Sequence, residues 1–532
     1  MFDRAELTRL AKALVSDIKA GQFNPAWQRI IDTLNQQPEH IFDLFDLLAK
    51  EGARKRPNEN LIGGYSFLLA HGLEQLRYAV ERNEASAIAL VGRLRQQLTS
   101  DGDAGRIAPP ILLLILKQFA SAKLDIGDGL RELMQHLMEN DAKAPAASER
   151  GAGEGYFARL AEDLGHDPFA IHACLDESAE TMPEETRAGM MMAIFGDTTP
   201  SMREAALGFL LNASALARTK VAELIFLAAP HGLVTPTMLR RMIAVRNWLS
   251  AQEQQSLDTA IKAARKAGVS CAPAPRPHVQ SVLVSGIDGS GALTILVIAT
   301  EGGKPVVGGL VLKQGFGVRD AWVRRGVSPA ELRDLLAHVG SEISLAPSTV
   351  DFAALAVSQF LATNLESKNL PPFGLLDFAE VAGISDLNPD AVPVELLVAQ
   401  LCADIDPARL SPGAINKTLR ESADWPDEIA SLESWFEDDV TKAVGTKRSA
   451  RANQMAVLLA GPLQARRRRW AELVAWMALS LKHQQTSADW QGFAIVAVEL
   501  LGARPLNEIG LMKVVADTTL TVLSIKGSRR AA

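Results

Sequence analysis

The sequence predicts a mainly α-helical protein, made of irregular or HEAT-like helical arrays, with one small antiparallel β-meander at about residues 279–326. Three observations lead to this fold class. Helix-starting residue pairs recur along much of the chain, and the apolar residues between them follow helical spacing. Short β-branched runs replace that spacing only in the middle of the chain, after a proline-rich segment.

Helix starts are marked by a capping residue directly before a proline. A Ser, Thr, Asp or Asn side chain accepts hydrogen bonds from the free N–H groups of the first turn, and a proline there has its φ already set. Six such pairs are Thr199-Pro200, Thr235-Pro236, Ser328-Pro329, Asn388-Pro389, Asp406-Pro407 and Ser411-Pro412. Ser328 is also followed three residues later by Glu331, which is the spacing of a capping box.

The stretch from about 184 to 268 is the most regular helical part of the chain. Helices are predicted near 184–195, 200–212, 217–229, 236–248 and 251–267. Short helices joined by short loops pack as antiparallel neighbours, so this stretch resembles the α-solenoids of the HEAT and armadillo type in general form. No motif recurs at a fixed period. An irregular helical domain is therefore an equal alternative, and no specific family is recognised.

Two linkers interrupt the helical pattern. Residues 140–155 are rich in Ala, Gly, Ser and Pro, which predicts a flexible segment, and residues 271–278 hold alternating prolines, which predicts a stiff spacer. Glycine-containing turns then separate four apolar runs, which is typical of an antiparallel meander. These runs are Val279–Ser285, Ala292–Thr300, Pro305–Lys313 and Val318–Arg324. A helix from 329 is expected to cover one face of this sheet.

Helical spacing resumes after the meander and continues to the C-terminus. Helices are predicted near 351–364, 393–403, 411–421, 426–443, 452–460, 463–483, 488–502 and 506–524. With 532 residues, the chain is too long for one ordinary domain. Its expected parts are an N-terminal helical domain (1–140), a helical-hairpin, solenoid-like domain (156–268), the β-meander with its covering helix (279–345), a helical domain (346–440) and a basic C-terminal helical region (441–532).

Composition predicts a folded cytoplasmic protein. Hydrophobic residues make up 48% of the chain and charged residues 22%, which is enough to build a core and argues against wholesale disorder. Three cysteines, far apart and without a CxxC, predict neither a disulfide framework nor a structural zinc site. The N-terminus has no signal-peptide layout, and the longest apolar run, Ile111–Leu116, is far too short to span a bilayer. No membrane partner is therefore expected.

Positive charge is concentrated at the C-terminal end. Residues 441–532 contain 14 Lys/Arg and 5 Asp/Glu, whereas the whole chain carries a net charge of −7. The candidate partner-binding residues are basic: Arg466, Arg467, Arg468, Arg469, Lys447, Arg448 and Arg451. Such a patch could attract a phosphate backbone, with Trp470 or Trp476 stacking on a base. Intramolecular ion pairing or a solvated helix face is the stronger alternative, and the spacing of Trp470 favours a core position.

The other motifs are interpreted as structural features rather than as binding or catalytic sites. The turn Gly286–Gly291 lacks the spacing of a Walker or dinucleotide loop and predicts a hairpin. His166, His172 and Cys174 are the one local cluster of transition-metal ligands, but Asp167-Pro168 favours a helix cap between them. The acids Glu437–Asp439 are expected on a solvated helix face. No protease, hydrolase, kinase or zinc-protease signature is present, and no metal or other cofactor is predicted.

Three functions remain open, in a definite order. The first is a protein-interaction platform or scaffold, because helical arrays offer extended binding surfaces, and its expected partner is another protein. The second is nucleic-acid or anionic-partner binding through the basic C-terminal region. The third is an enzyme with a site where the sheet meets the helices, which would require a deep pocket with converging charged groups. The oligomeric state does not follow from the sequence.

Overall fold

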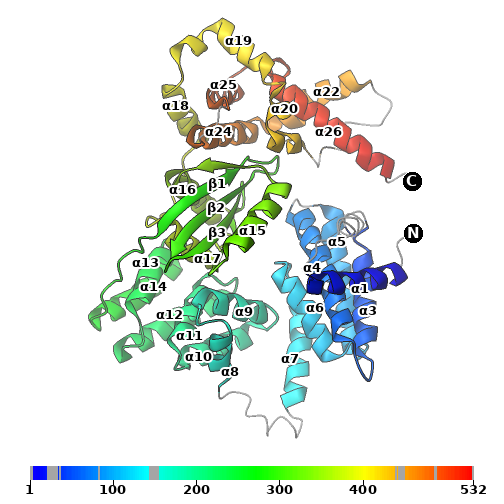
Figure 1. Ribbon diagram of the computed structural model, residues 1–532, viewed down its shortest axis with the longest axis vertical. Coiled ribbons are helices and arrows are strands. Elements are labelled where there is room, and N and C mark those ends of the chain that lie inside the picture. Colours follow the sequence, from blue (N-terminus) through cyan, green and yellow to red (C-terminus); the bar gives the residue numbers. More distant parts are fainter. Residues whose placement is uncertain are drawn as a thin grey trace. The chain divides into compact units, whose positions relative to one another are not determined.

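The computed structural model describes residues 4–20, 34, 37–81, 84–142, 155–437, 440, 450–484 and 488–529. The predicted mainly α-helical fold with a small central β module is confirmed (Figure 1). Within the described residues, all strands belong to a single five-stranded antiparallel sheet. The chain divides into two compact units, Met1–Leu224 and Ile225–Ala532, while the finer division into five domains stays a prediction.

The first unit begins with a helical bundle that has an aliphatic core. In α3 (His40–Gly52), Ile41, Leu44, Phe45 and Leu48 follow i, i+3, i+4 and i+7 spacing, and all four are buried. Close helix packing relies on Gly64, because a Cβ there would lie 2.5 Å from a backbone oxygen of α1. The bundle consists of α1 (Arg4–Ala20), α3, α4 (Glu59–Glu81), α5 (Ala85–Asp103), α6 (Pro109–Ser121) and α7 (Asp128–Ala142).

The five helices predicted between 184 and 268 are confirmed, and two further helices, α8 (Tyr156–Asp163) and α9 (Pro168–Glu180), precede them. They are α10 (Glu184–Gly196), α11 (Pro200–Ala206) with the 3-10 turn η1 (Leu207–Leu211), α12 (Ala215–Ala228), α13 (Pro236–Arg246) and α14 (Ala251–Lys266), with the 3-10 turn η2 (Ala229–His231) after α12. Thr235 caps α13 by accepting a hydrogen bond from the Met238 N–H, as its position before proline predicts. A HEAT-like arrangement of these helices stays a prediction.

The sheet contains the four predicted strands and one more. In order along the chain they are β1 (His278–Ser285), β2 (Ala292–Glu301), β3 (Lys304–Lys313), β4 (Gly317–Arg325) and β5 (Leu345–Ser348). Their spatial order is β4-β3-β2-β1-β5, with every neighbouring pair antiparallel. The sheet therefore extends beyond the predicted limit at 326. The helix α15 (Pro329–Glu342), with its predicted capping box, joins the two edge strands, so it must cross the sheet, where it packs against β3.

Two further helices pack on the sheet, α16 (Val350–Ser367) and α17 (Gly374–Ala382). Gly308 of β3 permits the close approach of α17, because a Cβ there would lie 3.0 Å from the Phe378 ring. Arg325 at the end of β4 forms an ion pair with Asp377 of α17, whose side chain is almost fully buried. At the start of β4, the Asn364 side chain accepts a hydrogen bond from the Val318 N–H at 2.7 Å. These contacts fix α16 and α17 to the same edge strand.

The remaining described elements are α-helices and 3-10 turns, and the helix predicted at 463–483 is divided in two at Arg466. The elements are α18 (Val394–Ala403), η3 (Pro407–Leu410), α19 (Pro412–Glu421), α20 (Trp425–Glu428), η4 (Ala430–Ser434), α22 (Arg451–Ala460), α23 (Pro462–Ala465), α24 (Arg467–His483), α25 (Trp490–Leu501), η5 (Leu506–Glu508) and α26 (Gly510–Arg529). The helix predicted over 426–443 is wrong up to Glu437, since α20 ends at Glu428 and is followed by the 3-10 turn η4; residues 438–439 and 441–443 lie outside the described residues. Asn388-Pro389 starts no helix either; α18 begins only at Val394, after Pro393, which disfavours helical backbone at the residue before it.

Candidate functional site

The four predicted arginines lie at the start of α24. Arg467, Arg468 and Arg469 form its first turn, and Arg466 precedes it with φ −101, between α23 and α24. The N-terminal end of a helix carries partial positive charge, so cations are disfavoured there by about 0.3–1 kcal/mol each. Nearby acceptors must compensate for this placement.

Glu437 supplies most of that compensation. Its carboxylate pairs with Arg466 and lies 3.5 Å from Nη1 of Arg469, and its Oε1 accepts a hydrogen bond from Nε1 of Trp470 at 3.0 Å. The Glu437 side chain is only 7% exposed. The expectation of a solvated helix face is therefore wrong for Glu437, because three donors draw the segment after η4 against α24. Asp438 and Asp439 lie outside the described residues.

The other arginine contacts join α24 to three more segments. Arg467 donates to the carbonyl oxygens of Glu499 and Leu500 at 2.6 and 2.5 Å, which satisfies the last turn of α25. Nη2 of Arg469 donates to the Gly289 carbonyl at 2.6 Å, in the turn between β1 and β2. Arg468 pairs with Glu395 of α18, and 65% of its side chain remains exposed. These contacts directly support the interpretation that the arginine run pairs with other parts of the same chain.

The remaining candidates of the basic region lie elsewhere. Nε of Arg451, on α22, pairs with Oδ1 of Asp517 of α26 at 2.7 Å, and both side chains are half exposed. Lys447 and Arg448 lie outside the described residues. Trp470 is fully buried, 5.6 Å from Trp435 between ring centroids, so its predicted core position is confirmed. The partner-binding role of the basic residues stays a prediction.

The glycine-rich turn before β2 is a hairpin turn, as its sequence predicts. Asp288 organises it by accepting hydrogen bonds from the Ala292 N–H at its side chain and the Gly291 N–H at its carbonyl. Gly291 has φ +79, which favours glycine, and Gly289 packs directly against the chain after η4. A Cβ on Gly289 would lie 1.9 Å from the Ser434 carbonyl oxygen. This turn therefore serves packing between the sheet and the 429–437 segment.

We expect Gly289→Ala to lower the free energy of unfolding by about 1–3 kcal/mol, because the backbone at Ser434 must shift to admit the methyl group. Gly340→Ala is the matched control, since that glycine lies in α15 with no atom near the added Cβ. Urea unfolding followed by circular dichroism measures both variants. Equal midpoints for the two variants would contradict the close packing at Gly289.

The histidine cluster is not assembled as a site, and neither are His278, Ser285 and Asp288, three residues of the Ser-His-Asp type that lie close together in sequence. Asp167 caps α9 by accepting from the Phe169 and Ala170 N–H groups, as predicted. His172 is buried with its ring 4.7 Å from that of Phe209. His278 and Ser285 stand at opposite ends of β1, about 23 Å apart at the usual rise of a strand. In the part of the chain that the structure describes, no group of three or more His, Cys, Asp or Glu could hold a metal ion.

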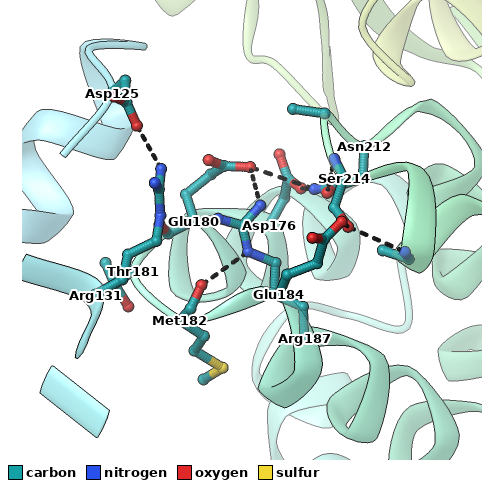
Figure 2. A network of polar contacts seen from close by, with 12 residues as sticks. Asp125, Arg131, Asp176, Glu180, Thr181, Met182, Glu184, Arg187, Asn212 and Ser214 are labelled. Atoms are coloured by element: carbon teal, nitrogen blue, oxygen red, sulfur yellow. Dashed lines mark hydrogen bonds and ion pairs between the residues drawn. The ribbon is translucent and has the colours of Figure 1, made fainter. Parts of the chain in front are cut away.

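A buried polar network in the first unit was not predicted from the sequence. Figure 2 shows Glu180 and Asp176, one turn apart on α9, facing Arg187 of α10 and Asn212. Nδ2 of Asn212 donates to both carboxylates, at 2.9 Å for Asp176 and 3.3 Å for Glu180. Nη1 of Arg187 lies 3.4 Å from Oε1 of Glu180, and Nε of Arg131, on α7, donates to the Glu180 carbonyl at 3.3 Å. The network therefore joins α7 to α9 and α10.

Burial is the main cause that raises the pKa of Glu180 above its ordinary value, and the charge of Asp176 adds to it, against opposing effects of the arginines and Asn212. A raised folded-state pKa stabilises the fold below the unfolded-state pKa, and this contribution is lost as pH rises through the folded-state value. We therefore expect Glu180→Gln to be at least as stable as wild type at pH 7.5. The stability advantage of the variant over wild type should fall as the pH is lowered toward 4.5. Thermal melts of the variant and of wild type, paired at each pH, measure this difference. If the stability of the variant relative to wild type were lower at pH 7.5 than at pH 5, the predicted direction of the pKa effect would be wrong.

In the second unit, residues of α13 and α17 line a small hollow. Glu380 of α17 accepts hydrogen bonds from Nε and Nη2 of Arg241 at 2.9 and 3.0 Å and from Nη2 of Arg240 at 2.7 Å. Burial acts to raise the pKa of Glu380, but the hydrogen bonds and charges of the two arginines outweigh it and hold that pKa below its ordinary value. The hollow encloses about 60 Å³, far less than the roughly 300–1,000 Å³ of most small-molecule sites.

Two parts of the chain are similar to Y4lR domains. Residues 183–268 match the Y4lR second domain, and residues 395–524 match the Y4lR C-terminal helical domain. A protein of Sinorhizobium fredii (strain NBRC 101917 / NGR234), described as "Uncharacterized protein y4lR", is 24% identical over 454 residues, which cover 84% of this chain and 86% of that protein. No solved structure matches.

The matched segments follow the elements of the structure. The second-domain match runs from the residue before α10 to just after α14, and the C-terminal match runs from the start of α18 into α26. The arginine run of α24 lies inside the C-terminal match, while the sheet lies between the two matches. Among the described helices, none combines the length and apolar character needed to cross a membrane.

Proposed function

We propose that this protein is a protein-interaction platform, a scaffold of packed helices that binds another protein. The observation that carries the proposal is a group of three exposed apolar side chains close together in sequence, at the end of α12 and just beyond it, which we call the apolar patch. Phe226, Leu227 and Leu233 are 45%, 61% and 37% exposed, although each is a large apolar side chain. Apolar side chains gathered on a surface mark protein–protein contacts more often than those scattered singly.

The contacts of the arginine run favour protein binding over nucleic-acid binding. Arg467 donates to helix-end carbonyls, and Arg466 and Arg469 share the buried Glu437. A phosphate would have to displace these acceptors before it could bind the same guanidinium groups. Arg468 is the most exposed of the four, and its partner Glu395 is itself half exposed. Substituting Arg468 therefore tests the hypothesis of nucleic-acid binding with the least damage to the fold.

The test compares three forms of the intact protein in pull-downs from nuclease-treated lysate. Phe226→Ser with Leu227→Ser removes the apolar patch, and Leu365→Ser, an exposed leucine of α16 that is 42% exposed, is the matched control. We expect a stoichiometric protein partner that is retained by wild type and by the control but lost by the patch variant. A partner retained by all three would contradict the role of the patch.

A parallel arm addresses nucleic acid. Without nuclease, nucleic acid that binds at low salt, leaves at moderate salt and is lost with Arg468→Glu would overturn the proposal in favour of anionic binding at α24, because binding to a phosphate backbone weakens steeply with salt. Unchanged retention by Arg468→Glu would remove α24 as the site.

A further inference from the structure

The exposed side of α12 carries a regular stripe of apolar and charged side chains. Leu216 and Leu227 are 41% and 61% exposed, and Lys220 and Glu223 lie between them on the same continuous helix. Successive members are four, three and four positions apart, so they fall on one line along the helix surface. This is the spacing of the a and d positions of a coiled coil. We call these four residues the α12 stripe.

The middle of the stripe is an ion pair within one chain. Nζ of Lys220 lies 2.8 Å from Oε2 of Glu223, and the two side chains are 32% and 55% exposed. An exposed pair of this kind contributes little to the stability of the fold, because both charges stay hydrated. An ammonium group has three donors and a carboxylate has two accepting oxygens. Each of these two groups can therefore bind a second group of opposite charge without leaving the first.

The α12 stripe is complementary to itself when it is reversed. Two α12 helices can lie antiparallel, related by a two-fold axis that passes at the centre of the stripe. Leu216 of one copy then lies opposite Leu227 of the other, and Lys220 of one copy lies opposite Glu223 of the other. A two-fold axis makes each of these contacts twice. A parallel pairing in register would instead place like charges together, which is unfavourable.

We propose that α12 is a dimerisation helix, whose stripe pairs antiparallel with the same stripe of a second copy of this chain. The leucine pairs bury apolar surface at the two ends of the contact, and the Lys–Glu pairs set its direction. Phe226, 45% exposed, flanks the stripe and adds apolar surface. The stripe has no net charge, so a strongly acidic or basic partner gains nothing from it, whereas the reversed stripe matches it at all four positions. This inference rests on the proposed function, because Phe226 and Leu227 belong to the apolar patch, and it names the partner.

The test reverses charges on the intact protein and measures self-association by sedimentation over a range of concentrations. A seam of three helical turns is a small contact, so we expect a reversible dimer. Salt at about 0.15 M screens the long-range repulsion between two chains that each carry a net charge of −7. Lys220→Glu leaves two acids in the stripe and Glu223→Lys leaves two bases. Each variant alone should therefore dimerise about tenfold more weakly than wild type, or worse.

Mixing the two variants is the decisive step. An acidic stripe then faces a basic one, so the mixture should regain association close to that of wild type, which also shows that neither variant had lost its fold. Lys417→Glu is the matched control, because it removes a similarly exposed ion pair, with Glu421 on α19, away from the stripe. It should change dimerisation less than about twofold, as for an exposed charge outside the contact.

Three results would overturn the inference: a monomeric wild type, single variants that dimerise like wild type, or a mixture that does not associate. The proposed function is judged separately in the pull-down. A monomeric wild type with a lysate partner that is lost in Phe226→Ser with Leu227→Ser would refute the dimer and leave the platform role standing. A dimer that obeys the charge reversals, with no other protein retained from lysate, would confirm the inference and count against a platform for a different protein.

Discussion

Replacing Trp470 with alanine is expected to lower the free energy of unfolding by about 3–5 kcal/mol, the range for deleting a fully buried large aromatic side chain. Trp470 has no exposed surface, it packs against Trp435, and its Nε1 donates to Glu437. Its loss leaves a cavity at the centre of the contacts that hold α24 to the 429–437 segment. Hydrogen exchange measures the effect best, because it reports the opening of α24 separately from the first unit.

Trp470→Phe is the control that separates packing from hydrogen bonding. Phenylalanine fills most of the space but cannot donate to Glu437, so we expect a loss of about 1–3 kcal/mol, as for a hydrogen bond to a charged acceptor. Equal protection of α24 in wild type and Trp470→Ala would contradict the core position of this tryptophan.

Glu437→Ala is expected to be the second most damaging change, with a loss of about 3 kcal/mol or more, as when one partner of a buried ion pair is removed. The substitution takes the shared acceptor from Arg466, Arg469 and the Trp470 indole at once. The arginines are each about one-third exposed and regain some hydration, whereas the indole N–H is buried. Protection against hydrogen exchange in α24 again provides the measurement.

A graded control exists at the same position. Glu437→Gln keeps an oxygen that can accept from the indole but removes the negative charge, so its loss should lie between those of wild type and Glu437→Ala. Raising the salt concentration should reduce the stability difference between wild type and Glu437→Gln only slightly, because salt screens a buried ion pair poorly. A gap that vanishes in salt would show that Glu437 is exposed in solution.

Much of the fold followed from local signals in the sequence. Thr235, Ser328 and Ser411 each cap the helix that the following proline begins, because a cap depends on neighbouring residues alone. The hairpin at Asp288 is equally local. The sheet beyond 326 was missed because β5 has four residues, one of them Pro347, and pairs with β1 rather than with its neighbour in sequence.

Tertiary contacts account for the other failures. The nine-residue α17 is so completely buried that no polar face reveals its period; seven of its residues, including Asp377, are buried. The run 426–443 has helical spacing, but Nε1 of Trp435 donates to the Ile287 carbonyl at 2.9 Å, and Glu437 turns inward to the arginines. The hollow between α13 and α17 joins residues about 140 positions apart, a pairing that no single-sequence pattern contains.

The position of β5 sets an order of assembly for the sheet. Strands β1 to β4 are joined by short turns, so each can pair as soon as its neighbour has been synthesised, and contacts between residues close in sequence form fastest. β5 reaches the outer edge of β1 only after α15 has crossed the sheet, and α15 has no fully buried residue to fix it early. Until then, β1 presents an open edge. A chain truncated near 326 would keep that edge permanently and would be prone to edge-to-edge association.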